Sequence, residues 1–183
     1  MLKKLMFSYL LSIMFLLPAV CVKEETGLQR LAKSIVSSSN SNDLRMDKIE
    51  KWVIQNINYK SDIKQFNMME RWTLPTETLQ RRSGDCEDGS ILLIALATAA
   101  GISPERLRLY VPIRVPSGWH ACAAYRREND EKWVWMEWAW KRNSAFLPVE
   151  RRKTIDEVPA YSRLGTYLSV SSLNPFNMEW GKD

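Results

Sequence analysis

The chain has 183 residues, with 26 lysines and arginines against 21 acidic residues and a formal net charge of +5. This length predicts one domain with a short appendage. The positive excess is mild and the basic residues are scattered, which excludes the clustered basic face of a nucleic-acid-binding protein. Three cysteines are too few for a scaffold built from disulfides.

The appendage is the segment 1–22, which has the layout of a secretory signal. Two lysines precede an apolar run over residues 5–17, followed by a proline and small residues around Cys21. We expect the domain, residues 23–183, to be exported: periplasmic, secreted or held at the membrane facing outward. An uncleaved anchor and lipidation of Cys21 are the alternatives, and membrane contact is expected only through this segment.

The first part of the domain predicts helices. Asn42 or Asp43 is expected to cap a helix over residues 44–57. Apolar side chains recur in this helix at a spacing of three to four: Met46, Ile49, Trp52, Val53 and Ile57. Residues 58–83 have the composition of a loop-rich connection with a short helical turn near Glu77.

A second helix follows a tight turn predicted at Gly84. Residues 91–96 are apolar on every face of this helix, which is typical of a buried central helix. Gly101 is expected to end it.

Beyond this helix, apolar residues alternate with polar ones over residues 107–115, which predicts a strand, and residues 119–125 and 133–139 predict two further strands. A polar turn at residues 127–131 joins the second strand to the third, and residues 166–171 predict an edge strand. Helices followed by an antiparallel sheet indicate an α+β fold, with the buried helix packed on the sheet.

Cys86 lies in the first turn of the buried helix, where free backbone N–H groups and the helix dipole favour a thiolate. A thiolate is the attacking form of a catalytic cysteine. The acidic neighbours Asp85, Glu87 and Asp88 work against this form, because negative charge raises the pKa of a thiol. A cationic histidine partner would offset them, and a buried structural cysteine is the alternative.

His120 is the only histidine in the chain and begins a predicted strand. Together with a cysteine at a helix start it suggests a nucleophile–base pair. Glu137 lies in the aromatic strand that follows, where a buried carboxylate needs a partner such as an imidazole N–H. A structural histidine and a surface glutamate are the alternatives.

Four segments resemble the transglutaminase-like cysteine peptidase superfamily: Trp72–Leu79, Arg82–Asp88, Ala99–Ile102 and Gly118–Ala121. The resemblance covers roughly residues 49–140. It implies a papain-like fold with Cys86 as nucleophile, His120 as general base and an acidic residue on the next strand. That residue is usually aspartate in the superfamily. Here the candidate is Glu137, whose longer side chain can still accept the imidazole N–H.

Two supporting roles stay open. Gln80 and Trp72 are candidate side-chain donors to an oxyanion, beside the backbone N–H of Cys86. Asp85 and Glu87 resemble calcium ligands of some relatives, but two carboxylates are too few without further oxygen ligands. We therefore expect no cofactor and no metal, with calcium as the alternative and Asp85 as a helix cap.

Cys122 lies two residues after His120, on the same face of the strand. We expect a small core residue there, with an inhibitory disulfide to Cys86 under oxidation as the alternative. One histidine and two cysteines at these spacings do not predict a zinc site.

These observations predict an exported thiol enzyme that attacks peptide or protein amides through a thioester and hydrolyses it, as a cysteine peptidase does. Transfer of the acyl group to an amine, as in a transglutaminase, is the nearest alternative. A non-catalytic binding module of the cell envelope is the other. The expected partner is a peptide or protein substrate, and no nucleic acid.

Overall fold

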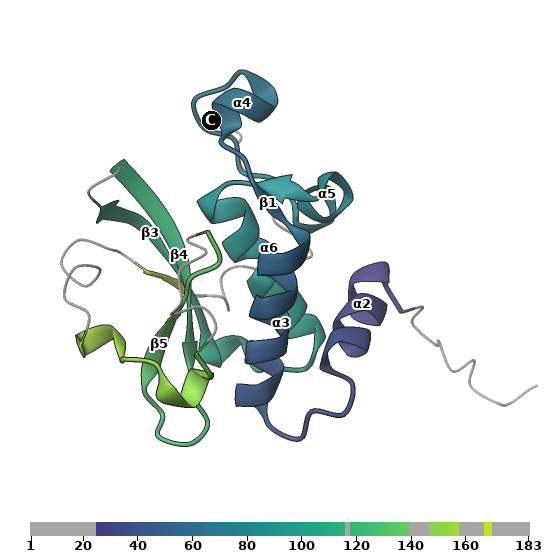
Figure 1. Ribbon diagram of the computed structural model, residues 1–183, viewed down its shortest axis with the longest axis vertical. Helices are drawn as coiled ribbons and strands as arrows, with labels where there is room; N and C mark the ends of the chain where they lie inside the picture. Colours follow the sequence, from purple (N-terminus) through teal and green to yellow (C-terminus); the bar gives the residue numbers. More distant parts are fainter. Residues whose placement is uncertain (1–24, 116–117, 140–146, 158–166, 170–183) are drawn as a thin grey trace, which may run out of the picture.

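The computed structural model describes residues 25–115, 118–139, 147–157 and 167–169 (Figure 1). The predicted signal at residues 1–22 lies outside the described residues. Along the chain the helices and strands are α2 (Gly27–Val36), α3 (Asn42–Asn56), β1 (Asn58–Tyr59), α4 (Asp62–Phe66), α5 (Pro75–Arg81), β2 (Ser83–Gly84), α6 (Cys86–Ala99), β3 (Leu107–Val115), β4 (Gly118–Arg126), β5 (Trp133–Met136) and β6 (Tyr167–Ser169). Short 3-10 helices cover Pro104–Arg106, Val149–Arg151 and Ile155–Glu157.

The main sheet is antiparallel, with strand order β5-β4-β3-β6. Helix α6 packs against β4 on one side and against α2, α3 and α5 on the other, so it lies between the sheet and the remaining helices (Figure 1). Its residues 87–97 are all buried. The predicted α+β fold with a buried helix on an antiparallel sheet is confirmed, because a helix without a polar face has to be covered on all sides.

Most predicted elements are present. The strands predicted over residues 107–115 and 119–125 correspond to β3 and β4, and β6 forms the predicted edge strand over three of its six residues. Helix α6 ends where expected, just before Gly101, whose φ of 89° is a left-handed conformation that glycine adopts without strain.

The cap predicted for α3 was wrong. Ser41 occupies the N-cap position, and its hydroxyl accepts a hydrogen bond from the backbone N–H of Leu44 at 3.2 Å. Asn42 and Asp43 lie inside the helix. The buried Asp43 carboxylate instead accepts the Tyr125 hydroxyl at 2.7 Å, which ties α3 to β4.

The segment 58–83 is more ordered than a loop-rich connection. It contains the predicted helical turn as α5, a further helix α4, and strand β1, which pairs in parallel with β2. Gly84 therefore lies in a strand, not in a tight turn. A side chain there would put its Cβ 2.6 Å from the Cβ of Asp88, so glycine is required by close packing.

The strand predicted over residues 133–139 was too long. Strand β5 ends at Met136, and the next residue, Glu137, turns its carboxylate back onto the chain. Its Oε1 accepts the backbone N–H of Ala139 at 3.0 Å, a bond that takes the place of continued pairing with β4. The carboxylate is thus held by a local turn at the end of the strand.

None of the helices among the described residues has the length and apolar character needed to cross a bilayer.

Candidate active site

Cys86 is the first residue of α6 and is partly exposed. It lies in a pocket that His120, Ala121, Trp72 and Trp119 also line. Asp85 occupies the N-cap position with an extended backbone, but its side chain makes no capping hydrogen bond, so the predicted cap is present in position only. The backbone N–H groups of the first turn therefore start directly at the cysteine.

A buried tryptophan fixes the first turn of α6. Nε1 of Trp138 donates to the carbonyl oxygen of Cys86 at 3.0 Å, and the Ser90 hydroxyl donates to the same carbonyl at 2.7 Å. The indole lies directly over Gly89, where a Cβ would fall 2.0 Å from a ring carbon. The segment after β5 thereby sets the position of the cysteine backbone.

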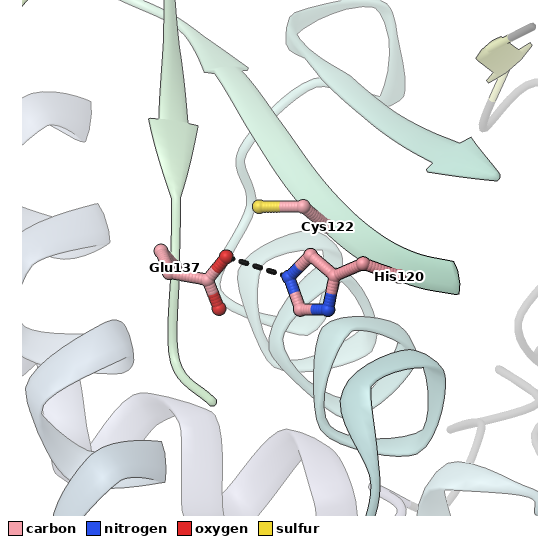
Figure 2. A group of neighbouring side chains, drawn as sticks. All are labelled: His120, Cys122 and Glu137. Atoms are coloured by element: carbon pink, nitrogen blue, oxygen red, sulfur yellow. Dashed lines mark hydrogen bonds and ion pairs between the residues drawn. The ribbon is translucent and has the colours of Figure 1, made fainter. Parts of the chain in front are cut away.

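His120 and Glu137 form a hydrogen-bonded pair (Figure 2). Nε2 of His120 lies 2.7 Å from Oε2 of Glu137, and both side chains are largely buried. The carboxylate accepts from Nε2, so Nδ1 is the ring nitrogen left for chemistry with the thiol. The sequence-based expectation that the imidazole is the partner of Glu137 agrees with this geometry.

The Cys86 thiol is held in its neutral form. Burial raises the pKa of this thiol, and the Glu87 carboxylate, which accepts the thiol hydrogen at 3.2 Å, raises it further. The backbone N–H of Ala121 acts in the opposite direction. The effect of the acidic neighbours is in the expected sense, although burial contributes more.

Acidic side chains from three segments gather beside Cys86. Ligand oxygens of Asp62, Asp85 and Asp88 lie within 4.8 Å of one another, as do those of Asp62, Glu70 and Glu87. We call these five residues the carboxylate cluster. Burial raises the pKa of Asp62 to about 6, of Asp85 to about 8 and of Asp88 to about 6.

Four carboxylates of the cluster each have one buried oxygen without a hydrogen-bond partner: Asp62 Oδ1, Asp85 Oδ1, Glu87 Oε1 and Asp88 Oδ2. Unpaired buried oxygens of this kind cost free energy unless a proton or a cation satisfies them. All are hard oxygen donors, the ligands that calcium prefers. The cluster therefore fits a divalent cation, with Asp62 and Glu70 supplying the oxygen ligands that the motif around Cys86 lacks.

The structure separates the two candidate oxyanion donors. Gln80 is exposed on α5 and lines a different pocket, together with Leu28 of α2, so it does not reach Cys86. Trp72 lines the Cys86 pocket, but its indole N–H donates to Glu70 at 2.7 Å. Gln80 fails because the αL residue Arg82 and strand β2 separate α5 from the cysteine.

The family follows from a comparison with known proteins. The sequence model of the transglutaminase-like superfamily matches residues 29–138, more than half of the chain. The chain belongs to the transglutaminase-like superfamily. The predicted superfamily membership and papain-like fold are thus confirmed, and the matched region includes Cys86, His120 and Glu137.

Two solved structures have a fold similar to that of this chain. Legionella pneumophila LapG in an EGTA-treated form is 16% identical, with a TM-score of 0.56 over 81% of this chain and 91% of that one. Its calcium-bound form is 19% identical, with a TM-score of 0.50 over 63% and 72%. At these identities the likeness concerns the fold alone. The comparison with curated proteins finds no match.

Proposed function

We propose that this transglutaminase-like chain is an exported cysteine peptidase that hydrolyses peptide or protein amides. Cys86 is the nucleophile, His120 the general base and Glu137 the residue that orients the histidine. The observation that carries the proposal is the 2.7 Å bond between His120 and Glu137 in a pocket shared with a helix-start cysteine. A histidine with a purely structural role would not be expected to line a pocket together with a cysteine thiol.

The first step is proton transfer from the thiol of Cys86 to Nδ1 of His120. Glu137 accepts the Nε2–H bond, which fixes the tautomer and stabilises the imidazolium that forms. The thiolate then lies at the positive end of α6, a helix of 14 residues. The imidazolium and the helix dipole both stabilise the thiolate, and so they oppose the burial and the acidic neighbours that favour the neutral thiol.

The thiolate then adds to the carbonyl carbon of the substrate, and its electron pair forms the new C–S bond while the carbonyl oxygen becomes an oxyanion. The backbone N–H of Cys86, at the start of α6, is the donor that we assign to this oxygen. Collapse of the intermediate breaks the C–N bond, and the imidazolium protonates the leaving amine. A thioester remains, and water activated by Nδ1 hydrolyses it to the acid and the free thiol.

We further propose that the carboxylate cluster holds a calcium ion, with Asp62, Glu70, Asp85, Glu87 and Asp88 as the ligands. Four unpaired buried oxygens support this assignment. LapG, with a similar fold, has a calcium-bound form. A bound divalent ion would neutralise the negative charge beside Cys86 and so favour its thiolate.

Export is part of the proposal and rests on residues 1–22, with their charged start, apolar run and small residues before Lys23. Outside the cytoplasm, free calcium is abundant enough for sites of modest affinity. Fractionation of expressing cells, with and without residues 1–22, tests this part directly.

Alkylation of Cys86 by iodoacetamide tests the catalytic pair. We expect rapid labelling at neutral pH with calcium, and slow labelling in His120→Ala; Cys86→Ala identifies the labelled thiol. Equal labelling rates of Cys86 in wild type and His120→Ala would contradict the catalytic pair and favour a non-catalytic binding module. Mass spectrometry of cleaved peptides, with and without an added primary amine, then separates hydrolysis from acyl transfer.

A further inference from the structure

A third side chain of a type that can bind metal ions lies beside the His120–Glu137 pair (Figure 2). Cys122 follows His120 on β4, and its side chain points to the same side of the strand. The sulfur of Cys122, a ring nitrogen of His120 and a carboxylate oxygen of Glu137 all lie within 4.8 Å of one another. Cys122 is buried in a small apolar cluster with Ala124, Trp135 and Ile155, as expected for a core residue, and it takes no part in the proposed hydrolysis.

The three atoms are one nitrogen, one sulfur and one oxygen, the donor types of zinc sites in proteins. A thiolate among them selects against calcium and magnesium, which prefer oxygen alone. Sequence reasoning discounted zinc because it counted only histidine and cysteine. Glu137 supplies the third ligand once the turn after β5 brings it to β4.

We propose that His120, Cys122 and Glu137 form an inhibitory zinc site inside the active site, an inference that rests on the proposed function. Water from the Cys86 pocket completes a tetrahedron. A zinc site needs a thiol at residue 122, whereas core packing alone would accept another small side chain.

The three candidate ligand atoms lie within 4.8 Å of one another, close to the spacing of ligands around one zinc ion. Zinc bound by a histidine nitrogen and a carboxylate oxygen keeps these atoms about 3.4 Å apart, and a thiolate about 3.6 Å from the nitrogen. Nε2 and Oε2 are now 2.7 Å apart, the length of a hydrogen bond. The ion thus takes the place of the shared proton, and the pair opens by a fraction of an ångström.

Zinc binding releases one proton per chain from the site. Zinc binding breaks the Nε2–H bond of His120 and the S–H bond of Cys122; the two protons leave to solvent, and Nδ1 takes up one proton from solvent. A neutral imidazole bound through Nε2 carries its one proton on Nδ1. Nδ1 can then accept a proton neither from Cys86 nor from the water that cleaves the thioester, which inhibits the enzyme.

Zinc has a path to the site. His120 lines the pocket that Cys86 also lines, and the side chain of Glu137 is 15% exposed. Cys122 itself is buried, at 1% exposure. The ion therefore reaches His120 and Glu137 first and binds Cys122 last.

Cobalt is the probe for the site, because thiolate-bound Co²⁺ absorbs in the near ultraviolet. The chain has three cysteines, so full-length protein with Cys21→Ser and Cys86→Ala retains Cys122 as its one thiol. With calcium saturating the carboxylate cluster, we expect a charge-transfer band that saturates at one cobalt per chain and is displaced by zinc. Addition of His120→Ala should weaken this binding more than about tenfold. Absence of the band, or a band unaffected by His120→Ala, would overturn the proposal.

The cobalt test needs no catalysis, so it stands or fails separately from the peptidase proposal. Inhibition is tested in protein that retains Cys86, by the effect of zinc on iodoacetamide labelling of that residue. We expect zinc to slow labelling in wild type and to lose this effect, by more than about tenfold in concentration, in Cys122→Ala and Cys122→Ser. Unchanged zinc sensitivity in both variants would mean that zinc binds Cys86 and His120 directly, and the site would be refuted.

Discussion

The indole of Trp138 occupies the space that a side chain at residue 89 would fill, since a Cβ on Gly89 would lie 2.0 Å from the ring. The same indole donates to the carbonyl of Cys86 at 3.0 Å. One contact between the turn after β5 and helix α6 therefore fixes the backbone of the proposed nucleophile.

Gly89→Ala will force Trp138 out of this position. We expect a loss of about 1–3 kcal/mol in the free energy of unfolding, the usual cost of overpacking a core, and slower alkylation of Cys86. Urea denaturation and iodoacetamide labelling measure the two effects. Gly27→Ala is the matched control, because a Cβ at Gly27 meets no atom within 4 Å. A Gly89→Ala protein as stable as this control would contradict the contact.

Glu137→Gln will keep the fold and lower activity. The amide oxygen can still accept the Nε2–H bond, but a neutral amide does not stabilise an imidazolium. We expect kcat/KM to fall by about 10²–10⁴-fold, measured on a cleaved peptide. Glu150→Gln, an exposed position, is the control for a glutamate-to-glutamine change. Equal activity in Glu137→Gln would remove the carboxylate from the proposed mechanism.

Removal of calcium will lower both stability and Cys86 reactivity. When the ion is absent, the carboxylates of the cluster either take up protons or repel one another, because four of their oxygens are buried and unpaired. At a calcium concentration of 100 times Kd we expect about 2.7 kcal/mol of stabilisation relative to EGTA, measured by urea denaturation. Asp62→Asn should abolish most of this difference, whereas the exposed Asp156→Asn should retain it. A stability that EGTA does not alter would exclude the ion.

Glu50 will make stability depend on pH. This side chain is fully buried and accepts from Arg152 at 2.6 Å, and burial raises its pKa from 4.5 to about 7 despite the arginine. A raised pKa means that the folded state holds the proton more tightly than the unfolded state. The stability contribution is therefore complete below about pH 4.5 and is lost as pH rises through about 7.

Glu50→Gln stays neutral at every pH, so the difference in unfolding free energy between wild type and this variant isolates the carboxyl group. We expect wild type to lose about 3 kcal/mol relative to the variant between pH 4.5 and 8. Parallel stability profiles would show that the Arg152 pair keeps the carboxylate charged throughout.

The parts of the fold that could be predicted from the sequence are those with a local pattern. Helix α6 is apolar on every face, and apolar residues alternate along the nine residues of β3. The pairing of Glu137 with His120 was also accessible, because a short polar turn makes their strands neighbours.

The carboxylate cluster was not accessible in this way. Asp62 and Glu70 come from a segment without strong periodicity, and they reach Cys86 only because β1 pairs with β2. The prediction of Gln80 as an oxyanion donor also failed. It rested on the short distance along the chain to Cys86, which does not show in which direction the helix points a side chain. The end of β5 was predicted too late in the chain. The hydrogen bond from the Ala139 backbone N–H to the Glu137 carboxylate ends the strand, and the aromatic pattern of the sequence gives no sign of this bond.

The two-residue pairing of β1 with β2 has a wider consequence. Asn58 pairs with Ser83, and Tyr59 with Gly84, so the chain between them begins and ends at one point of the domain. This excursion contains Asp62, Glu70 and Trp72, which contribute to the carboxylate cluster and to the wall of the pocket. Lengthening a closed loop twofold costs only about 0.6 kcal/mol of chain entropy. The part of this excursion before α5 can therefore change in length at a small entropic cost, which would alter the ligands offered to an ion and the wall of the pocket while α5 stays packed on the cysteine helix.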